Sequence, residues 1–167
     1  MTLVANQILN QQQIDHIVRR IAFQIYETNS EEKTVILAGI VENGFILAQK
    51  IKQQLEKISP LKAVLCKIKI DKKNPLQPIK TSLKVEDYTN ASIVLIDDVL
   101  NSGSTLIYGV KHFLEVPIQQ IKTAVLVDRS HKKFPVKADF KGISLSTSLH
   151  ENVQVIFEKG NDRAILE

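Results

Sequence analysis

The stretch IVLIDDVLNSGST occupies residues 93–105. Its four consecutive apolar residues, 93–96, are typical of a parallel strand buried on both faces. This run meets Asp97 and Asp98, and a loop of small polar residues then leads into the helically spaced apolar residues of 106–114. A strand, a loop and a helix in this order predict an α/β fold with the loop at the carboxyl edge of the sheet.

The loop has the composition of a phosphate-binding loop; its residues are Asn101, Ser102, Gly103, Ser104 and Thr105. The free N–H groups of a helix N-terminus and the hydroxyls beside them bind anions. Asp97 and Asp98 are suited to hydroxyl groups or to a hydrated metal ion. Taken alone, the two acids could also simply mark the place where the strand reaches solvent, with a cap for the next helix and no ligand. The run of small donors favours a ligand, because ordering it costs entropy, and we predict one with a phosphate and a diol.

Two other phosphate-binding motifs are excluded. The sequence contains no GxxxxGK[ST] and no GxGxxG after a predicted strand.

Alternating strands and helices are predicted along the rest of the chain. Apolar spacing predicts a helix over 11–28, with a capping box formed by Asn10 and Gln13. A second helix carries apolar residues from Leu47 to Ile58 and ends at Pro60. Further strands are predicted at 34–41, 63–70, 121–127, 153–157 and 164–166. We therefore expect an open, mainly parallel twisted sheet flanked by helices.

Two consequences follow for the loops. Those at 41–44, 98–105 and 128–133 each follow a strand, so they should meet at one edge of the sheet. Segment 71–90 has two prolines, many lysines and no clear period, and we interpret it as a mobile excursion.

The composition fits one domain of 167 residues with a sizeable core. The net charge of +4 is compatible with anionic substrates or RNA. The single cysteine, Cys66, lies in an apolar run, which indicates a buried thiol and excludes a disulfide framework. No apolar stretch approaches the roughly 20 residues that a membrane-spanning helix needs, and no signal peptide is evident. We expect a cytoplasmic protein that does not interact with membranes.

Residues 94–105 closely resemble the phosphoribosyl diphosphate (PRPP) motif of type I phosphoribosyltransferases. Residues 124–131 (AVLVDRSH) and 135–140 (PVKADF) resemble the PyrR-type pyrimidine operon regulators of that family, which bind RNA and also act as uracil phosphoribosyltransferases. The resemblance covers most of the chain and weakens between Lys69 and Ala91. It implies a single domain over 1–167, with a small hood contributed by about 129–150 and the N-terminal segment.

The resemblance also implies roles for individual residues. Asp97 and Asp98 would be catalytic and hold the ribose 2- and 3-hydroxyls, and residues 101–105 would cradle the 5-phosphate. The remaining implied positions are the pyrophosphate loop (Val41, Glu42, Asn43 and Gly44) and the base pocket (Asp128, Arg129, Phe140 and Lys141). The aromatic face of Phe140 could stack on the nucleobase. Mg²⁺ would arrive with PRPP, held by water and substrate oxygens, with no metal site of the protein's own.

The pyrophosphate loop departs from the family pattern. Relatives usually carry a basic residue before the glycine, whereas Glu42 and Asn43 place an acid and an amide there. A carboxylate facing pyrophosphate repels it, so the loop favours binding of PRPP or a nucleotide over turnover. Lys72 and Lys73 could reach pyrophosphate when the excursion closes.

Three functions are implied. The first is transfer of the ribose 5-phosphate of PRPP to a nucleobase, uracil above others, with release of pyrophosphate. The second is a nucleotide-sensing regulator of pyrimidine genes with weak or no catalysis. It would bind leader RNA through a basic patch that could equally be solvated surface: Arg19, Arg20, Lys132, Lys133 and Lys137. The third is a hypoxanthine-type purine transferase, although such relatives usually carry a lysine where this chain has Asp128. A homodimer or higher homo-oligomer is usual in the resembled family.

Overall fold

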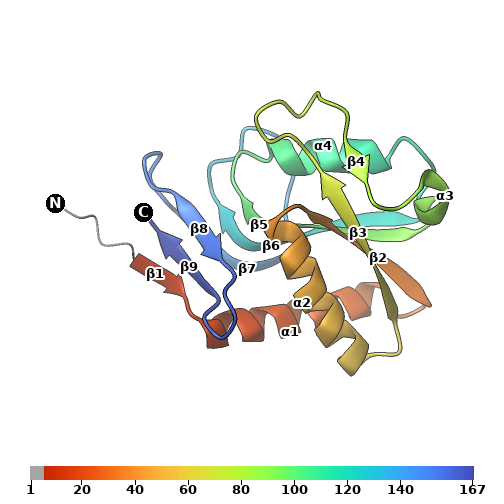
Figure 1. Ribbon diagram of the computed structural model, residues 1–167, viewed down its shortest axis with the longest axis horizontal. Coiled ribbons are helices and arrows are strands. Elements are labelled where there is room, and N and C mark those ends of the chain that lie inside the picture. Colours follow the sequence, from red (N-terminus) through yellow and green to blue (C-terminus); the bar gives the residue numbers. More distant parts are fainter. Residues whose placement is uncertain (1–5) are drawn as a thin grey trace.

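The computed structural model describes residues 6–167 as a central sheet with helices on both faces and a small second sheet at one end (Figure 1). The central sheet has the strand order β4-β3-β2-β5-β6-β7, and only β4 runs antiparallel to its neighbour. This arrangement confirms the predicted open, mainly parallel α/β fold.

The elements have the following bounds. The central strands are β2 (Thr34–Ile40), β3 (Lys62–Lys69), β4 (Lys80–Thr81), β5 (Ser92–Leu100), β6 (Gln120–Arg129) and β7 (Phe140–Leu145). The helices are α1 (Gln11–Thr28), α2 (Asn43–Ile58), α3 (Val85–Tyr88) and α4 (Ser104–Phe113). The small sheet consists of β1 (Asn6–Leu9), β9 (Arg163–Leu166) and β8 (Val153–Ile156), all antiparallel.

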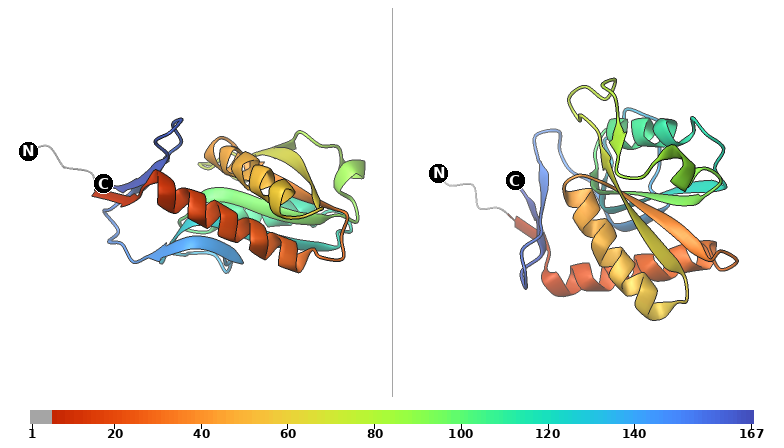
Figure 2. Two further views of the ribbon diagram at one scale, coloured as in Figure 1. Left: turned by 90° about the horizontal axis from the view of Figure 1, so that it is seen from below. Right: turned by 45° about the vertical axis from the view of Figure 1, so that its right-hand side comes forward.

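Two hydrophobic cores lie on opposite faces of the central sheet. Helices α1 and α2 pack on one face and α4 on the other (Figure 2). Successive residues of β5 alternate between them: Val94 and Ile96 enter the first core, Ile93 and Leu95 the second. Burial on both faces explains why the strand reads as a continuous apolar run.

The helix predicted over 11–28 is confirmed, together with its capping box. Asn10 Oδ1 accepts a hydrogen bond from the Gln13 N–H, and Gln13 Oε1 accepts one from the Asn10 N–H, both at 2.9 Å. None of the helices in residues 6–167 is long and apolar enough to cross a membrane.

Two segments differ from the sequence-based expectation. The excursion 71–90 contains β4 and α3, and Tyr88 of α3 packs edge-on against Phe113 of α4. Phe140–Leu145, which we expected in the hood, forms β7 of the central sheet, because its backbone pairs in parallel with β6. The small sheet at the end of the molecule is formed by β1, β8 and β9 instead.

Candidate functional site

The carboxyl ends of β2, β5 and β6 bring the three predicted loops together at one edge of the sheet. Side chains link the loops directly. Asn43 Nδ2 donates to Asp98 Oδ2 at 3.0 Å, and Arg129 Nη1 donates to Asn101 Oδ1 at 3.0 Å. The backbone N–H of Lys133 donates to the Ser102 carbonyl at 2.7 Å. The predicted convergence of these loops is therefore confirmed.

The two adjacent acids have different surroundings. Asp97 is only 2% exposed; its Oδ1 accepts the Asp98 N–H at 2.9 Å, and its Oδ2 lies 3.4 Å from Lys72 Nζ. Asp98 is half-buried and accepts the Val99 N–H at 2.9 Å as well as the Asn43 amide. Both carboxylates thus lie where β5 leaves the core.

The pKa of Asp97 is raised to about 7, first by burial and then by the neighbouring charge of Asp98, against an opposing effect of Lys72. A buried carboxylate is stable only when donors or cations surround it. Hydroxyl groups of a ligand would provide such donors, which fits the expected diol.

The loop over 101–105 begins helix α4. Gly103 precedes the helix with a φ of 89°, in the left-handed region that glycine favours. A Cβ atom there would lie 2.6 Å from Val136 Cγ1 of the same chain, so the packing of Val136 on the loop also favours glycine. The predicted loop lines one pocket together with residues of β5 and the excursion: Lys72, Asp97, Val99, Leu100, Asn101, Ser102, Gly103, Thr105 and Leu106. Amides, hydroxyls, an acid and a lysine therefore share one small cavity.

The 41–44 loop packs tightly against the end of β5. A Cβ on Gly44 would lie 2.5 Å from the Ile96 carbonyl oxygen, so only glycine lets α2 begin this close to the acids. The second N–H of the Asn43 side-chain amide donates to the Val155 carbonyl of β8 at 2.9 Å. Asn43 therefore joins the acids to the small sheet, and both of its amide hydrogens are used. Glu42 is exposed and makes no ion pair with any described residue.

Arg129 is buried, and its guanidinium donates hydrogen bonds to other residues of the protein. Nε donates to Thr147 Oγ1 at 3.0 Å, and Nη2 donates to the Glu151 carbonyl at 2.5 Å. Together with the hydrogen bond to Asn101, these contacts connect the loop over 101–105 to residues 147–151. The structure thus gives Arg129 a bracing role next to the predicted base pocket.

Asp128 lies at the centre of a small charged group. Its Oδ2 is 3.4 Å from Lys141 Nζ and 3.6 Å from Lys132 Nζ, while its buried Oδ1 has no partner within residues 6–167. Phe140 is placed elsewhere. It is 6% exposed and belongs to the core beneath α1. The predicted stacking of Phe140 on a base is wrong, because strand alternation turns its ring to the opposite face from Lys141.

The predicted basic patch is largely engaged within the protein. Arg20 donates to the carbonyls of Lys141 and Gly142 at 2.9 and 2.8 Å, and Lys137 lies 3.6 Å from Asp139 Oδ1. Lys132 pairs with Asp128, and the Arg19 guanidinium lies 5.7 Å from the ring centroid of Phe23. Among the described residues of this patch, only Lys132 and Lys137 thus face a carboxylate, while Arg19 and Arg20 keep their positive charge.

Sequence reasoning missed the contacts that Arg129 and Asn43 make with Thr147, Glu151 and Val155. Two of these three partners are backbone carbonyls, which are independent of residue type and leave no pattern in the sequence.

Comparisons with known proteins agree on one family. The family model described as "Phosphoribosyl transferase domain" matches residues 4–157. The chain is 33% identical over 160 residues to the Bifunctional protein PyrR of Fusobacterium nucleatum subsp. nucleatum, covering 91% of this chain and 90% of that protein. It is 31% identical over 163 residues to the Bifunctional protein PyrR of Macrococcus caseolyticus, covering 93% and 94%.

Solved structures share the fold at low sequence identity. The hypoxanthine phosphoribosyltransferase of Trypanosoma cruzi has a TM-score of 0.76 at 14% identity, covering 90% of this chain and 85% of that one. A hypoxanthine-guanine phosphoribosyltransferase of Bacillus anthracis has a TM-score of 0.73 at 17% identity, covering 87% and 85%.

Proposed function

The chain belongs to the type I phosphoribosyltransferase family, and on this premise we propose that it transfers the ribose 5-phosphate of PRPP to uracil and releases pyrophosphate. One observation carries the proposal: the buried acid Asp97 and the amide- and hydroxyl-rich loop from Asn101 to Thr105 line the same pocket. A diol and a phosphate of one ligand would be held there together. The PyrR relatives and the resemblance in 124–140 support uracil as the base.

Each group has a defined task in the proposed reaction. Asp97 and Asp98 accept hydrogen bonds from the ribose 2- and 3-hydroxyls, and the N–H groups at the start of α4 hold the 5-phosphate. The bond from C1 to pyrophosphate breaks, a bond from C1 to the base nitrogen forms, and the proton of that nitrogen passes to solvent. Positive charge develops on the ribose in between, and the two carboxylates stabilise it.

Mg²⁺ fits this site as a companion of PRPP. The carboxylates of Asp97 and Asp98 offer oxygen ligands, and we assign the rest of the ion's coordination to substrate oxygens and water, which Mg²⁺ usually keeps. When bound, the ion neutralises charge on the leaving pyrophosphate.

The base pocket is proposed around Asp128 and Lys141, with the adjacent Arg129 bracing the nearby loops through Asn101, Thr147 and Glu151. Asp128 Oδ1 is buried and has no hydrogen-bond partner among the described residues 6–167, and Lys141 Nζ lies 3.4 Å from the other oxygen of the same carboxylate. An acceptor and a donor side by side match the N–H and C=O groups of uracil. Hypoxanthine carries the same pair of groups, so the purine alternative is decided by assay.

The test is a turnover panel with radiolabelled PRPP, Mg²⁺ and each of uracil, cytosine, hypoxanthine and guanine. The expected result is uridine monophosphate from uracil alone. Product from hypoxanthine instead would establish the purine alternative, and no product with any base at high enzyme concentration would refute phosphoribosyl transfer.

Glu42 offers a paired experiment on the pyrophosphate loop. Glu42→Arg should raise turnover, because a cation replaces the carboxylate beside the leaving group. Glu42→Gln is the matched control, since it removes the negative charge without adding a positive one. Unchanged turnover in both variants would show that the acid does not limit the reaction.

We propose a nucleotide-sensing RNA-binding regulator of pyrimidine genes as the second candidate function. The exposed carboxylate of Glu42 in the pyrophosphate loop favours this function. It would slow the transfer reaction but leave the binding of a nucleotide intact. A gel shift with pyrimidine-operon leader RNA, with and without uridine nucleotide at stated salt, is the test. Affinity equal to that for a scrambled RNA would exclude it.

Two general properties complete the proposal. We assign a homodimer or higher homo-oligomer on the family resemblance, which analytical ultracentrifugation would test. We propose a cytoplasmic location, as expected from the sequence. Fractionation of cells that produce the protein would test this assignment.

A further inference from the structure

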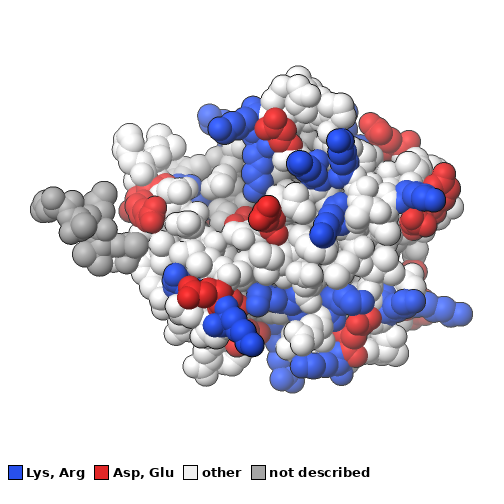
Figure 3. All heavy atoms as spheres, in the orientation of Figure 1, with Lys and Arg blue, Asp and Glu red and all other residues white. Residues whose placement is uncertain are grey.

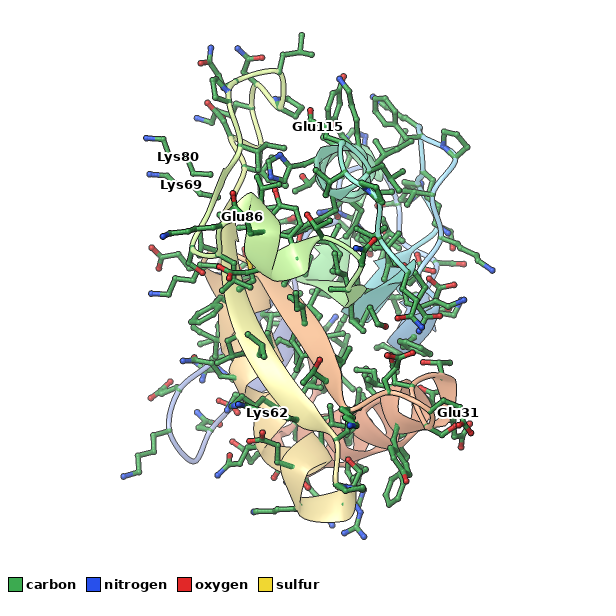
Figure 4. All side chains as sticks on the ribbon, turned by 90° about the vertical axis from the view of Figure 1, so that its right-hand side faces the viewer. Glu31, Lys62, Lys69, Lys80, Glu86 and Glu115 are labelled. Carbon is green, nitrogen blue, oxygen red and sulfur yellow. The ribbon has the colours of Figure 1, made fainter. Side chains whose placement is uncertain are left out.

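Lys69 of β3 and Lys80 of β4 form a directly opposed pair in the β3–β4 hairpin. The two residues are register partners in an antiparallel ladder, so their side chains leave the same face a few ångströms apart. Figure 4 shows the two side chains pointing out of the molecule side by side. Like charges in this arrangement repel each other and destabilise the hairpin unless an anion lies between them.

A third lysine extends the row. Lys67 lies two residues before Lys69, and the alternation of a strand places both on one face, about 7 Å apart along β3. Lys67 Nζ lies 5.0 Å from the ring centroid of Phe45, the residue that follows the 41–44 loop. The row therefore runs from the edge of the candidate site to the base of the excursion.

No acid forms a direct ion pair with this row within residues 6–167. All three lysines are exposed, and within residues 6–167 none has a carboxylate within 4.0 Å of its ammonium nitrogen. From Lys67 to Lys84 the chain has six lysines and one acid, Asp71. Asp71 lines a hollow beside Lys69 and Lys80, but its Oδ1 accepts two backbone N–H groups of the following turn. Figure 3 shows basic side chains over β3 and β4 in the upper half of the view.

Protection of a sheet edge explains only part of this pattern. Lysines on edge strands keep sheets from pairing with other chains, and Lys80 of the edge strand β4 fits that role. Lys67 and Lys69 belong to β3, which is paired on both sides by β2 and β4. β4 pairs with β3 only at Ile68 and Lys69, and the Lys67 carbonyl also accepts the Ser82 N–H at 2.9 Å. The open part of the β3 edge therefore precedes Lys67, so protection of that edge does not account for Lys67 and Lys69.

We propose that Lys67, Lys69 and Lys80 form a binding surface, the β3–β4 lysine face, for the phosphate backbone of a single-stranded nucleic acid. A row of three cations suits a chain of phosphates better than a single anion, which would reach only one or two of them. Positive rows that follow the backbone are how proteins bind single strands without reading sequence. The inference does not rest on phosphoribosyl transfer, and the surface differs from the patch over 19–20 and 132–137.

The test measures the salt dependence of binding. A fluorescein-labelled 12-nucleotide single-stranded RNA of mixed sequence is titrated with the protein at 50, 100 and 200 mM salt, followed by fluorescence anisotropy. The variant Lys69→Gln/Lys80→Gln removes two of the cations. Each lost phosphate contact lowers the slope of log K against log salt by about 0.7 for single strands. Between 50 and 200 mM salt, the wild type should therefore lose about 7-fold more affinity than the variant.

The matched control is Lys57→Gln/Lys62→Gln, which removes two exposed lysines near the opposite end of β3 and should keep the wild-type slope. A melting curve checks folding, and removal of the opposed charges should not lower the Tm. Equal slopes for the wild type and Lys69→Gln/Lys80→Gln, or no binding of the RNA, would overturn the proposal. Tighter binding of a duplex of the same sequence would overturn the single-strand assignment. The RNA-binding assay contains no PRPP. Its result therefore does not depend on whether the protein transfers phosphoribosyl groups.

Discussion

Replacing Asp97 with asparagine should stabilise the free protein and weaken its affinity for PRPP. The Asp97 side chain is 3% exposed, and its carboxylate faces one cation, Lys72, whose side chain is 51% exposed. Asparagine keeps an oxygen that can accept the Asp98 N–H now bound at 2.9 Å. The substitution therefore removes a buried charge while its main backbone contact remains.

The magnitude follows from the pKa of Asp97, raised from 3.8 to about 7. Because the folded pKa lies above the unfolded one, the folded state binds more protons between these values, and wild-type stability falls as the pH rises from about 4 to about 7. At 1.36 kcal/mol for each pKa unit, ionised Asp97 lowers the free energy of unfolding by about 4 kcal/mol above pH 7. The advantage of Asp97→Asn should thus grow by about 3 kcal/mol between pH 5 and pH 8.

Urea denaturation followed by circular dichroism at pH 5, 6.5 and 8 would measure this difference. Glu31→Gln is the control, since Glu31 is exposed and its substitution should add little pH dependence. A stability difference between the wild type and Asp97→Asn that stays constant from pH 5 to pH 8 would refute the reasoning. In calorimetry, Asp97→Asn should bind PRPP about 10-fold more weakly or worse, as expected when hydrogen bonds to a charged group are lost.

Three further substitutions test the surroundings of the site. Asn43→Ala removes two side-chain hydrogen bonds. It should lower the free energy of unfolding by about 2–3 kcal/mol and raise the KM for PRPP. A variant with wild-type values would contradict the role of Asn43 in joining the acids to the small sheet. Gly103→Ala combines a φ of 89° with a contact of 2.6 Å to Val136 Cγ1; it should lose about 1–2 kcal/mol in thermal denaturation, whereas an unchanged Tm would show that the loop relaxes freely. Lys69→Glu turns the repulsive pair with Lys80 into an attractive one; it should raise the free energy of unfolding at low salt by about 0.2–1 kcal/mol, and destabilisation would mean that the two charges do not oppose each other.

The sequence predicted those features that depend on nearby residues. Burial on both faces leaves an uninterrupted apolar run, so Ile93–Ile96 could be assigned to a central strand from composition alone. The capping box of Asn10 and Gln13 spans three residues and was equally readable. Both β4, with two residues, and α3, with four, are too short to show a period, which explains why the excursion looked irregular.

The side-chain roles were less predictable, because they depend on direction and on distant partners. Phe140 was assigned to the base pocket from its aromatic ring, but its place in β7 turns that ring into the core. Arg129 stands beside the expected pocket in sequence, yet its guanidinium binds Thr147 and Glu151, 18 and 22 residues away. Motif position correctly predicted that the three loops meet at one edge of the sheet, but it could not determine where individual side chains point.

The positive charge nearest the acids comes from the excursion rather than from the pyrophosphate loop. Glu42 gives that loop an exposed carboxylate, whereas Lys72 Nζ lies 3.4 Å from Asp97 Oδ2. The excursion is held by two register pairs between β3 and β4 and by Ile79, Leu83 and Tyr88, which pack on the second core. The Lys72 side chain itself is 51% exposed, so it can turn away from Asp97 without disturbing that packing. A cation on such a segment can balance the buried acid in the free protein and move to pyrophosphate when PRPP arrives. The same movement would expose Asp97 to the ribose hydroxyls. These hydroxyls would then replace Lys72 as partners of the carboxylate while Lys72 binds pyrophosphate.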